Sequence, residues 1–151
     1  MRLPKLAVLS ALSIVAALAQ EIPVNYPTLH GHRFISMSLD NFHEHVFEVK
    51  DHGVAVKMKG ILFGQFLRAA GWGRTARTEG TSYQVRITGR GRALTFDLAD
   101  IEHGSFRQQV LLIRERDGKP IPWDDRPILV VIDDDDAVTD TLPGVLSVRV
   151  F

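Results

Sequence analysis

The most informative absence in this chain of 151 residues is cysteine, of which it has none. Without cysteine there can be no disulfide bond, thiolate nucleophile, thiolate-ligated zinc, iron–sulfur cluster or thioether-linked haem. The fold must then be held together by the burial of apolar side chains, which a domain of this size can supply. The length fits one such domain.

An excess of charge of either sign is also missing. The 18 lysines and arginines balance 18 aspartates and glutamates, so the formal net charge is zero at pH 7. Such a chain presents no general field that would attract nucleic acid or an anionic membrane surface. The hydrolase motifs G-x-S-x-G and H-E-x-x-H are absent as well. The sequence therefore shows no recognisable motif for nucleophilic or general acid–base catalysis.

Long apolar runs are confined to the N-terminus. Arg2 and Lys5 are followed by an apolar run over 6–19 that ends in Ala-Leu-Ala. The run is shorter than the about 20 residues that a membrane-spanning helix needs, and its small-x-small ending is typical of a signal-peptide cleavage site. The sequence predicts a signal peptide over 1–19 and a periplasmic or secreted protein that begins at Gln20 and does not insert into the membrane. An uncleaved membrane anchor is the alternative.

The rest of the chain has the pattern of an α+β domain that is mostly β. Residues 20–34 contain two prolines and no clear period, and they are predicted to form an extended N-terminal arm before a domain over 35–151. Helical spacing over 60–71 predicts one main helix, and 97–102 a single helical turn. About seven short strands are expected from alternation or apolar runs, with weaker alternation over 34–39. These strands are 46–50, 54–59, 83–88, 93–96, 109–114, 127–132 and 145–150.

Several stretches in this order carry a recognisable pattern. They are HVFEVKDHGVAVKMKGILFGQFLRAAG (45–71), RALTFDLADIE (92–102), LLIRERDGKPIP (111–122), PILVVI (127–132) and GVLSVRV (144–150). Together they resemble the molybdopterin-binding oxidoreductase domain, the sulfite-oxidase-like fold. The resemblance covers roughly residues 35–151 and implies that fold for the chain.

The resemblance also bears on chemistry. Molybdenum enzymes of this family hold the metal through a cysteine thiolate, which this chain lacks, so molybdenum is not expected here. Small exported relatives without that cysteine are thought to bind a pterin in the same cleft, in some cases beside membrane-bound signalling proteins. The chain differs from those relatives at Arg90-Gly91-Arg92, where they have Asp-Gly-Tyr, at Pro143-Gly144, where many have Trp-Gln, and at 133–136, where arginines are common.

Basic and aromatic residues near the expected cleft are the candidate ligand-binding residues. Arg114 and Arg116 are two positions apart on one predicted strand, so both are expected to face the same side. Arginine forks suit phosphate or carboxylate groups, and Arg92 lies at the neighbouring turn. Trp123, in a polar loop, offers a flat face for stacking on a ring. The alternative is that the arginines do not bind a ligand, but lie on an exposed strand and form ion pairs with nearby acidic residues.

Two further clusters suggest metals. His43 and His45 would point the same way on a strand, as zinc or copper ligands must. We expect them instead to be surface histidines, and no metal is predicted. The run of four aspartates over 133–136 lacks the glycine of an EF-hand and is expected to be a solvated loop.

These features predict a non-catalytic periplasmic module that binds a small planar heterocycle. The resemblance implies that a pterin is the ligand and that the partner is another exported or membrane-anchored protein. One alternative is a molybdopterin-dependent oxidoreductase, or an accessory subunit, without a cysteine metal ligand. Another is a metal carrier based on histidine.

Overall fold

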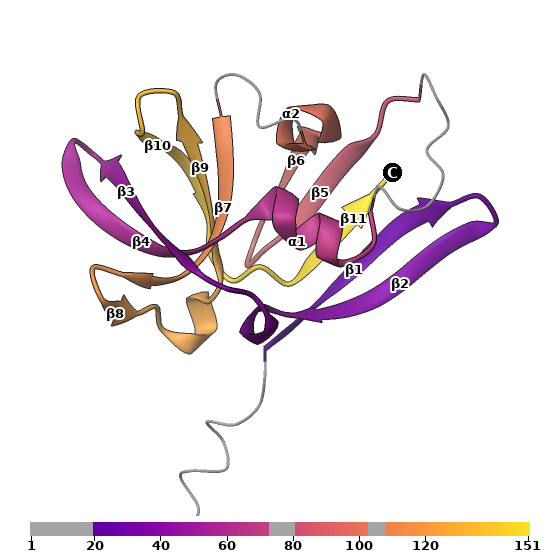
Figure 1. The fold of residues 1–151 in the computed structure, drawn as a ribbon, viewed down its shortest axis with the longest axis horizontal. Coiled ribbons are helices and arrows are strands. Elements are labelled where there is room, and N and C mark those ends of the chain that lie inside the picture. The colour runs from indigo at the N-terminus through magenta and orange to yellow at the C-terminus, as the bar shows by residue number, and fades with distance from the viewer. Residues whose placement is uncertain (1–19, 73–80, 103–107) are drawn as a thin grey trace, which may run out of the picture.

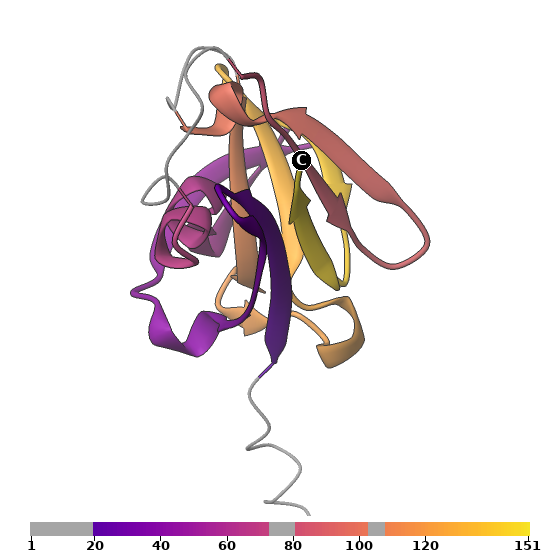
Figure 2. The same ribbon diagram turned by 90° about the vertical axis from the view of Figure 1, so that its right-hand side faces the viewer.

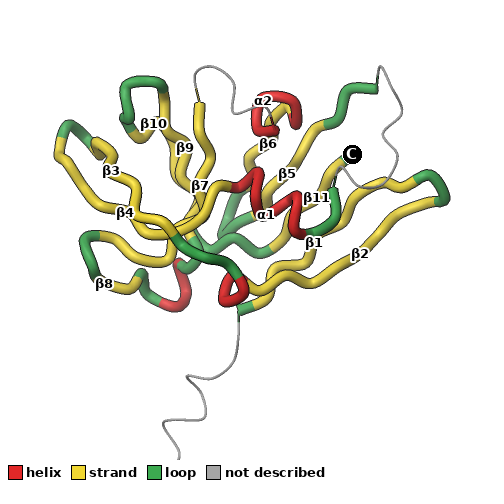
Figure 3. Tube along the Cα trace, viewed as in Figure 1, coloured by secondary structure: helices red, strands yellow, loops and turns green. Residues whose placement is uncertain are grey.

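The fold is known from a computed structural model, which describes residues 20–72, 81–102 and 108–151. Strands dominate it, and the helices are short (Figures 1 and 3). The helices are α1 (Phe63–Ala69), α2 (Leu98–Glu102) and the 3-10 helices η2 (Leu39–Asn41) and η3 (Trp123–Asp125). The strands are β1 (Glu21–Thr28), β2 (Gly31–Ser38), β3 (His45–Asp51), β4 (Val54–Leu62), β5 (Gln84–Thr88), β6 (Ala93–Asp97), β7 (Gln108–Arg116), β8 (Lys119–Pro120), β9 (Ile128–Asp133), β10 (Val138–Leu142) and β11 (Ser147–Val150).

The strands form two sheets. The five-stranded sheet has the order β2-β1-β11-β5-β6, and its neighbours are antiparallel except for β1 and β11, which run parallel. The six-stranded sheet has the order β10-β9-β7-β4-β3, with the short β8 paired to β7. A parallel bridge between Lys50 and Ala137 joins the two ends of this order. The six-stranded sheet is therefore strongly curled.

The main core lies between the two sheets. It takes the inner side chains of the five-stranded sheet, such as Ile22 and Val148, and the side chains of β7 and β9 that face them, such as Leu112. Helix α1 adds Phe63 and Phe66, both fully buried. Figure 2 shows α1 on one side of the molecule and the β5–β6 hairpin on the other. Burial of apolar area on this scale is the main stabilising contribution available to a chain without cross-links.

A smaller core fills the concave side of the curled sheet. It contains Val49, Met58, Leu111, Ile113 and Val130, with neighbours from the same strands. Strands β7 and β9 therefore bury both of their faces, one against each core. This explains why LLI and ILVVI in these strands are apolar without alternation.

An irregularity in the pairing of β4 and β7 turns the end of β7. Lys59 pairs with Glu115 and Gly60 with Ile113, which leaves Arg114 as the extra residue of a β-bulge. A Cβ atom at Gly60 would lie 1.9 Å from the carbonyl oxygen of Leu112. Only glycine allows this close approach of the two backbones.

The prediction of an extended N-terminal arm over 20–34 was wrong. Residues 21–38 form the β1–β2 hairpin, and Ile22, Val24 and Tyr26 are buried in the main core. The domain therefore includes β1 and does not begin at residue 35. The two prolines stand at positions 23 and 27, on the outward side of β1, where they leave the inward apolar alternation intact.

The fold class, α+β and mostly β, is confirmed, but eleven strands are present in the described residues rather than about seven. The missed strands are β1, β8 and β10. The main helix begins at Phe63 rather than at residue 60, because Gly60–Leu62 continue β4 and pair with β7. Among the described residues, no helix has the length and apolar character needed to cross a membrane.

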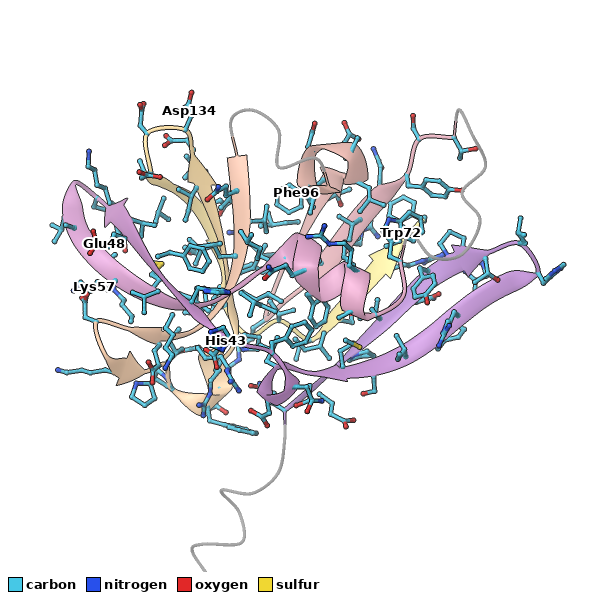
Figure 4. All side chains as sticks on the ribbon, in the orientation of Figure 1. His43, Glu48, Lys57, Trp72, Phe96 and Asp134 are labelled. Carbon is cyan, nitrogen blue, oxygen red and sulfur yellow. The ribbon has the colours of Figure 1, made fainter. Side chains whose placement is uncertain are left out.

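Trp72 packs at the end of α1. It is buried, and its ring meets that of Tyr26 edge-on at 6.0 Å and that of Tyr83 at 5.0 Å between centroids. Figure 4 shows it just beyond the helix. The Tyr26 hydroxyl donates a hydrogen bond of 2.9 Å to the carbonyl of Ala70. Together these contacts fix α1 against β1.

Candidate functional site

A cavity of about 420 Å³ opens at the concave side of the curled sheet. Its volume falls in the range of about 300–1,000 Å³ that is usual for small-molecule sites. The apolar part of its wall is formed by Met58, Ile113, Ile121, Ile128, Val130 and Val138. The polar part is formed by Asp51, His52, Arg116, Thr139, Asp140 and Thr141, and Pro143 completes the lining. An apolar wall with polar groups along one margin is suited to an amphipathic ligand.

One margin of the cavity is an ion pair between Asp51 and Arg116. Asp51 ends β3, Arg116 ends β7, and the distance between Oδ2 and Nη1 is 2.6 Å. The Asp51 carboxylate also lies 2.8 Å from Nδ1 of His52, which is fully exposed at the β3–β4 turn. The hydrogen bond from Arg116 holds the pKa of Asp51 below its usual value, although burial works in the other direction. Asp51 is therefore ionised at neutral pH.

The polar margin carries a second ion pair. Arg92, from the β5–β6 turn of the other sheet, lies 2.5 Å from the carboxylate of Asp140 on β10. It also donates a hydrogen bond to the carbonyl of Thr141. The hydrogen bond from Arg92 lowers the pKa of Asp140, against the opposing effect of burial. The margin thus holds two ionised carboxylates, each with its own arginine.

The charges and hydrogen-bond acceptors at this margin favour one kind of ligand over others. The charges at the margin balance within each pair, so the cavity residues that the structure describes offer no unpaired positive charge to a strong anion. Each carboxylate retains lone pairs that its arginine does not fill, because an ionised carboxylate offers about four acceptor sites. A ligand with N–H donors on one edge and an apolar or flat body matches both features.

Of the four predicted ligand residues, two belong to this cavity. Arg116 lines it, and Arg92 reaches its margin through Asp140. The prediction that Arg114 and Arg116 face the same side was wrong, because the bulge at Arg114 intervenes. Arg116 stands opposite Met58, a residue of the smaller core, whereas Arg114 turns to other partners.

Arg114 ties the segment after β2 to β7. It is hydrogen-bonded to the carboxylates of Asp40 and Glu44, with 3.1 Å from its Nε to Glu44. Burial opposes its charge, but the hydrogen bonds to Glu44 and Asp40 outweigh burial and raise the pKa of Arg114. Its guanidinium is thus already engaged by two acids, and we assign it a structural role.

Trp123 lies outside the cavity lining. It begins η3, its side chain is 51% exposed, and the guanidinium carbon of Arg126 lies 5.2 Å from its ring centroid. It is not a core residue. Its role as a stacking partner for a ligand stays a prediction, because the neighbouring Ile121, rather than Trp123, contributes to the wall.

The histidine pair is exposed. The rings of His43 and His45 meet edge-on with 5.1 Å between centroids, near the start of β3 (Figure 4). Within the described part of the chain, they belong to no cluster of three potential ligand groups. The one such cluster there is Asp133, Asp134 and Asp135, at the exposed β9–β10 turn. Aspartate side chains at an exposed turn are common without a metal, and Asp133 already accepts hydrogen bonds from the backbone N–H groups of Asp135 and Ala137.

Asp51 and Asp140 were not singled out by the sequence. Asp51 precedes a turn glycine and resembles an ordinary turn residue, and Asp140 lies on β10, a strand that the sequence did not predict. The signal that could have identified Asp140 is the alternation of Val138, Asp140 and Leu142 with the threonines between them.

Comparisons with known proteins do not assign the chain to a family. No protein-family model matches the chain, and no curated protein matches its sequence.

Proposed function

We propose that this protein is a non-catalytic module that binds a small planar heterocycle of the pterin type. The observation that carries the proposal is the cavity of about 420 Å³, which combines an apolar wall with two ionised carboxylates at its margin. A flat ring that packs against the apolar wall buries surface that was exposed to water. This burial contributes about 25 cal/mol of binding free energy per Å² of apolar area.

The carboxylates account for selectivity. A pterin carries an amino group beside a ring N–H, and a carboxylate accepts both hydrogens side by side. Asp51 and Asp140 are held in place by Arg116 and Arg92, so little side-chain freedom is lost when a ligand binds. We assign recognition of the ring edge to these two aspartates and their positioning to the two arginines.

The fold family and the location are part of the same proposal. The hairpin of β3 and β4 followed by α1, then β5 and β6 with α2, then β7 and β8, has the order of the stretches that resemble the sulfite-oxidase-like fold. The beginning of β1 at Glu21 supports export, because cleavage after Ala19 would leave every described strand intact. Contact with another exported or membrane-anchored protein is proposed from the resemblance alone.

The two alternatives fit the residues less well. A molybdenum centre of this family needs a cysteine ligand that the chain does not have, so its residues do not fit that group. The phosphate of a molybdopterin would also have to compete with Asp51 and Asp140 for Arg116 and Arg92. A metal carrier would have to rely on His43 and His45, which are exposed and lack a third ligand among the described residues.

The proposal is tested by titrating the protein with pterin and following the quenching of pterin fluorescence. Saturable binding is expected, and the loss of one charge-assisted hydrogen bond in Asp51→Asn or Asp140→Asn should weaken it by roughly tenfold or more. Asp100→Asn, exposed on α2, is the matched control and should bind as the wild type does. Absence of saturable binding, or equal binding by all three variants, would refute the assignment.

A further inference from the structure

The outer face of the five-stranded sheet brings two arginines together. Arg149 on β11 and Arg86 on β5 are directly opposite each other in the antiparallel register. Both are exposed, and the guanidinium carbons lie 5.9 Å and 5.8 Å from the ring centroid of Phe151. Within the described residues, neither arginine is paired with a carboxylate. Two guanidinium groups thus share the Phe151 ring, and neither has an acidic partner among the described residues.

This pairing is unfavourable for folding. Like charges directly opposite each other on a sheet are destabilising. Arg114 and Arg116 on β7, by contrast, are each matched with an acid. Contact with the ring face offsets the repulsion only in part, because an exposed cation–π contact contributes about as much as one weak hydrogen bond. A bound anion would remove the repulsion altogether.

A depression adjoins the arginines. Its volume is about 450 Å³, and it extends over β1, β2 and β11 with Arg149 in its lining. Pro23, Phe34 and Ile35 give it an apolar surface, and the Phe34 side chain is 75% exposed. The register aligns Phe34, Asn25, Arg149 and Arg86 in one row across four strands. Apolar surface therefore passes directly into positive charge along this row.

Asn25, between Phe34 and Arg149 in the row, adds a polar group. In the described part of the chain its Oδ1 atom has neither solvent contact nor a hydrogen-bond donor. Buried polar atoms without a partner are rare in folded proteins. A small rotation of the carboxamide would present this atom to a hydroxyl or N–H group in the depression.

From these observations we propose that the outer face of the five-stranded sheet is a second binding site, for a soluble organic phosphate with an apolar body. The phosphate lies between Arg86 and Arg149, and the apolar body lies over Pro23 and Phe34. A phosphate monoester carries close to two negative charges at pH 7, which matches the two guanidinium groups, whereas a carboxylate would satisfy only one fork.

This site is separate from the cavity at the curled sheet, since the main core lies between the two. A small molecule is favoured over a membrane surface, because the positive charge is limited to two arginines beside a depression of definite size. The nearest acid along β1 on the same face is Glu21, whose carboxylate accepts a hydrogen bond from Ser36.

The test is calorimetric titration of the protein with phenyl phosphate, in parallel with inorganic phosphate and phenol. Phenyl phosphate should bind more tightly than either fragment. Arg149→Gln and Arg86→Gln should each weaken its binding by about tenfold or more, and Phe34→Ser should reduce the advantage over inorganic phosphate. Arg68→Gln, an exposed arginine on α1, is the control and should leave the affinity unchanged.

Two further measurements make the result decisive. The midpoint of thermal unfolding of Arg149→Gln should equal or exceed that of the wild type, because the repulsion with Arg86 is removed; a variant that lost binding by unfolding would instead melt earlier. Sedimentation with vesicles of anionic phospholipid should show no binding. Equal affinity of all variants for phenyl phosphate, or binding to vesicles alone, would overturn the proposal.

Discussion

Arg116 and Asp51 form an ion pair of 2.6 Å that joins the end of β7 to the end of β3. The two strands are not neighbours in the sheet, because β4 lies between them. The pair therefore spans the curl of the sheet and joins two strand ends at the margin of the cavity.

The pair predicts a dependence of stability on pH. The pKa of Asp51 is lower in the folded protein than in the unfolded chain, so its contribution is present above about pH 4 and is lost as the pH falls through the lowered value. Asp51→Asn should cost at most about 1 kcal/mol at pH 7, since Arg116 is half exposed, and this cost should shrink as the pH falls through the lowered pKa of Asp51. Urea unfolding at several pH values measures this, with Asp100→Asn as a control whose effect should not vary in the same way.

Arg114 is predicted to matter for stability rather than for binding. Its removal leaves Glu44, whose side chain is only 15% exposed, without its charged partner. Arg114→Met should therefore cost about 1–3 kcal/mol in the free energy of unfolding. Adding Glu44→Gln should recover part of that loss, and pterin affinity should stay within about twofold of the wild type when it is measured by fluorescence titration. Loss of pterin affinity at unchanged stability would show that Arg114 contacts the ligand.

Gly60 is predicted to tolerate no side chain. In Gly60→Ala the added Cβ would meet the carbonyl oxygen of Leu112 at 1.9 Å, and backbone on both sides prevents relief. We expect a loss of about 3 kcal/mol or more, or failure to fold. Gly118→Asn is the control: this turn residue has positive φ and open space around it, and asparagine accepts that conformation, so little change in the melting temperature is expected.

Trp123 provides a test of where the ligand lies. A ligand confined to the cavity would not stack on Trp123, whose ring does not line it, and Trp123→Ala should then change pterin affinity by less than about twofold. The exposed position implies a small effect on unfolding. A loss of tenfold to a hundredfold, the scale of about 1–3 kcal/mol for stacking on an aromatic ring, would show that the ligand reaches across to η3.

The N-terminus of the mature protein is predicted to be Gln20. Mass spectrometry of the protein recovered from its native host should give a mass that corresponds to residues 20–151, in the periplasmic or extracellular fraction. Recovery of the chain with Met1 in the cytoplasm would contradict both the signal peptide and the proposed location.

The sequence is most informative where neighbouring residues determine the structure. The β3–β4 hairpin follows from alternation on both sides of a glycine turn, and its strands lie within a residue or a few of the predicted ranges. The end of the helical region near Gly71 is predicted for the same reason, since that residue has a positive φ of 100°.

Features that depend on distant segments could not be predicted. β1 takes its place because β11, near the other end of the chain, pairs with it, and no local pattern encodes that partner. The cavity also depends on distant segments. Arg92 and Arg116 are recognisable as basic residues, but the pairing of Arg116 with Asp51 depends on the curl of one sheet, and that of Arg92 with Asp140 depends on how the two sheets pack. The bulge at Arg114 arises from an unpaired residue, which period-two alternation does not reveal.

The parallel pairing of β1 with β11 has a consequence for the order of events during biosynthesis. The N-terminal hairpin reaches the rest of its sheet only through β11, so β1 cannot pair with that sheet before residues 147–150 have been synthesised. Contacts between such distant segments slow folding, because a long loop must close before they form. Until β11 is in place, the apolar side chains of β1 have no sheet to pack in, and an unpaired β1 is compatible with the export proposed for this chain.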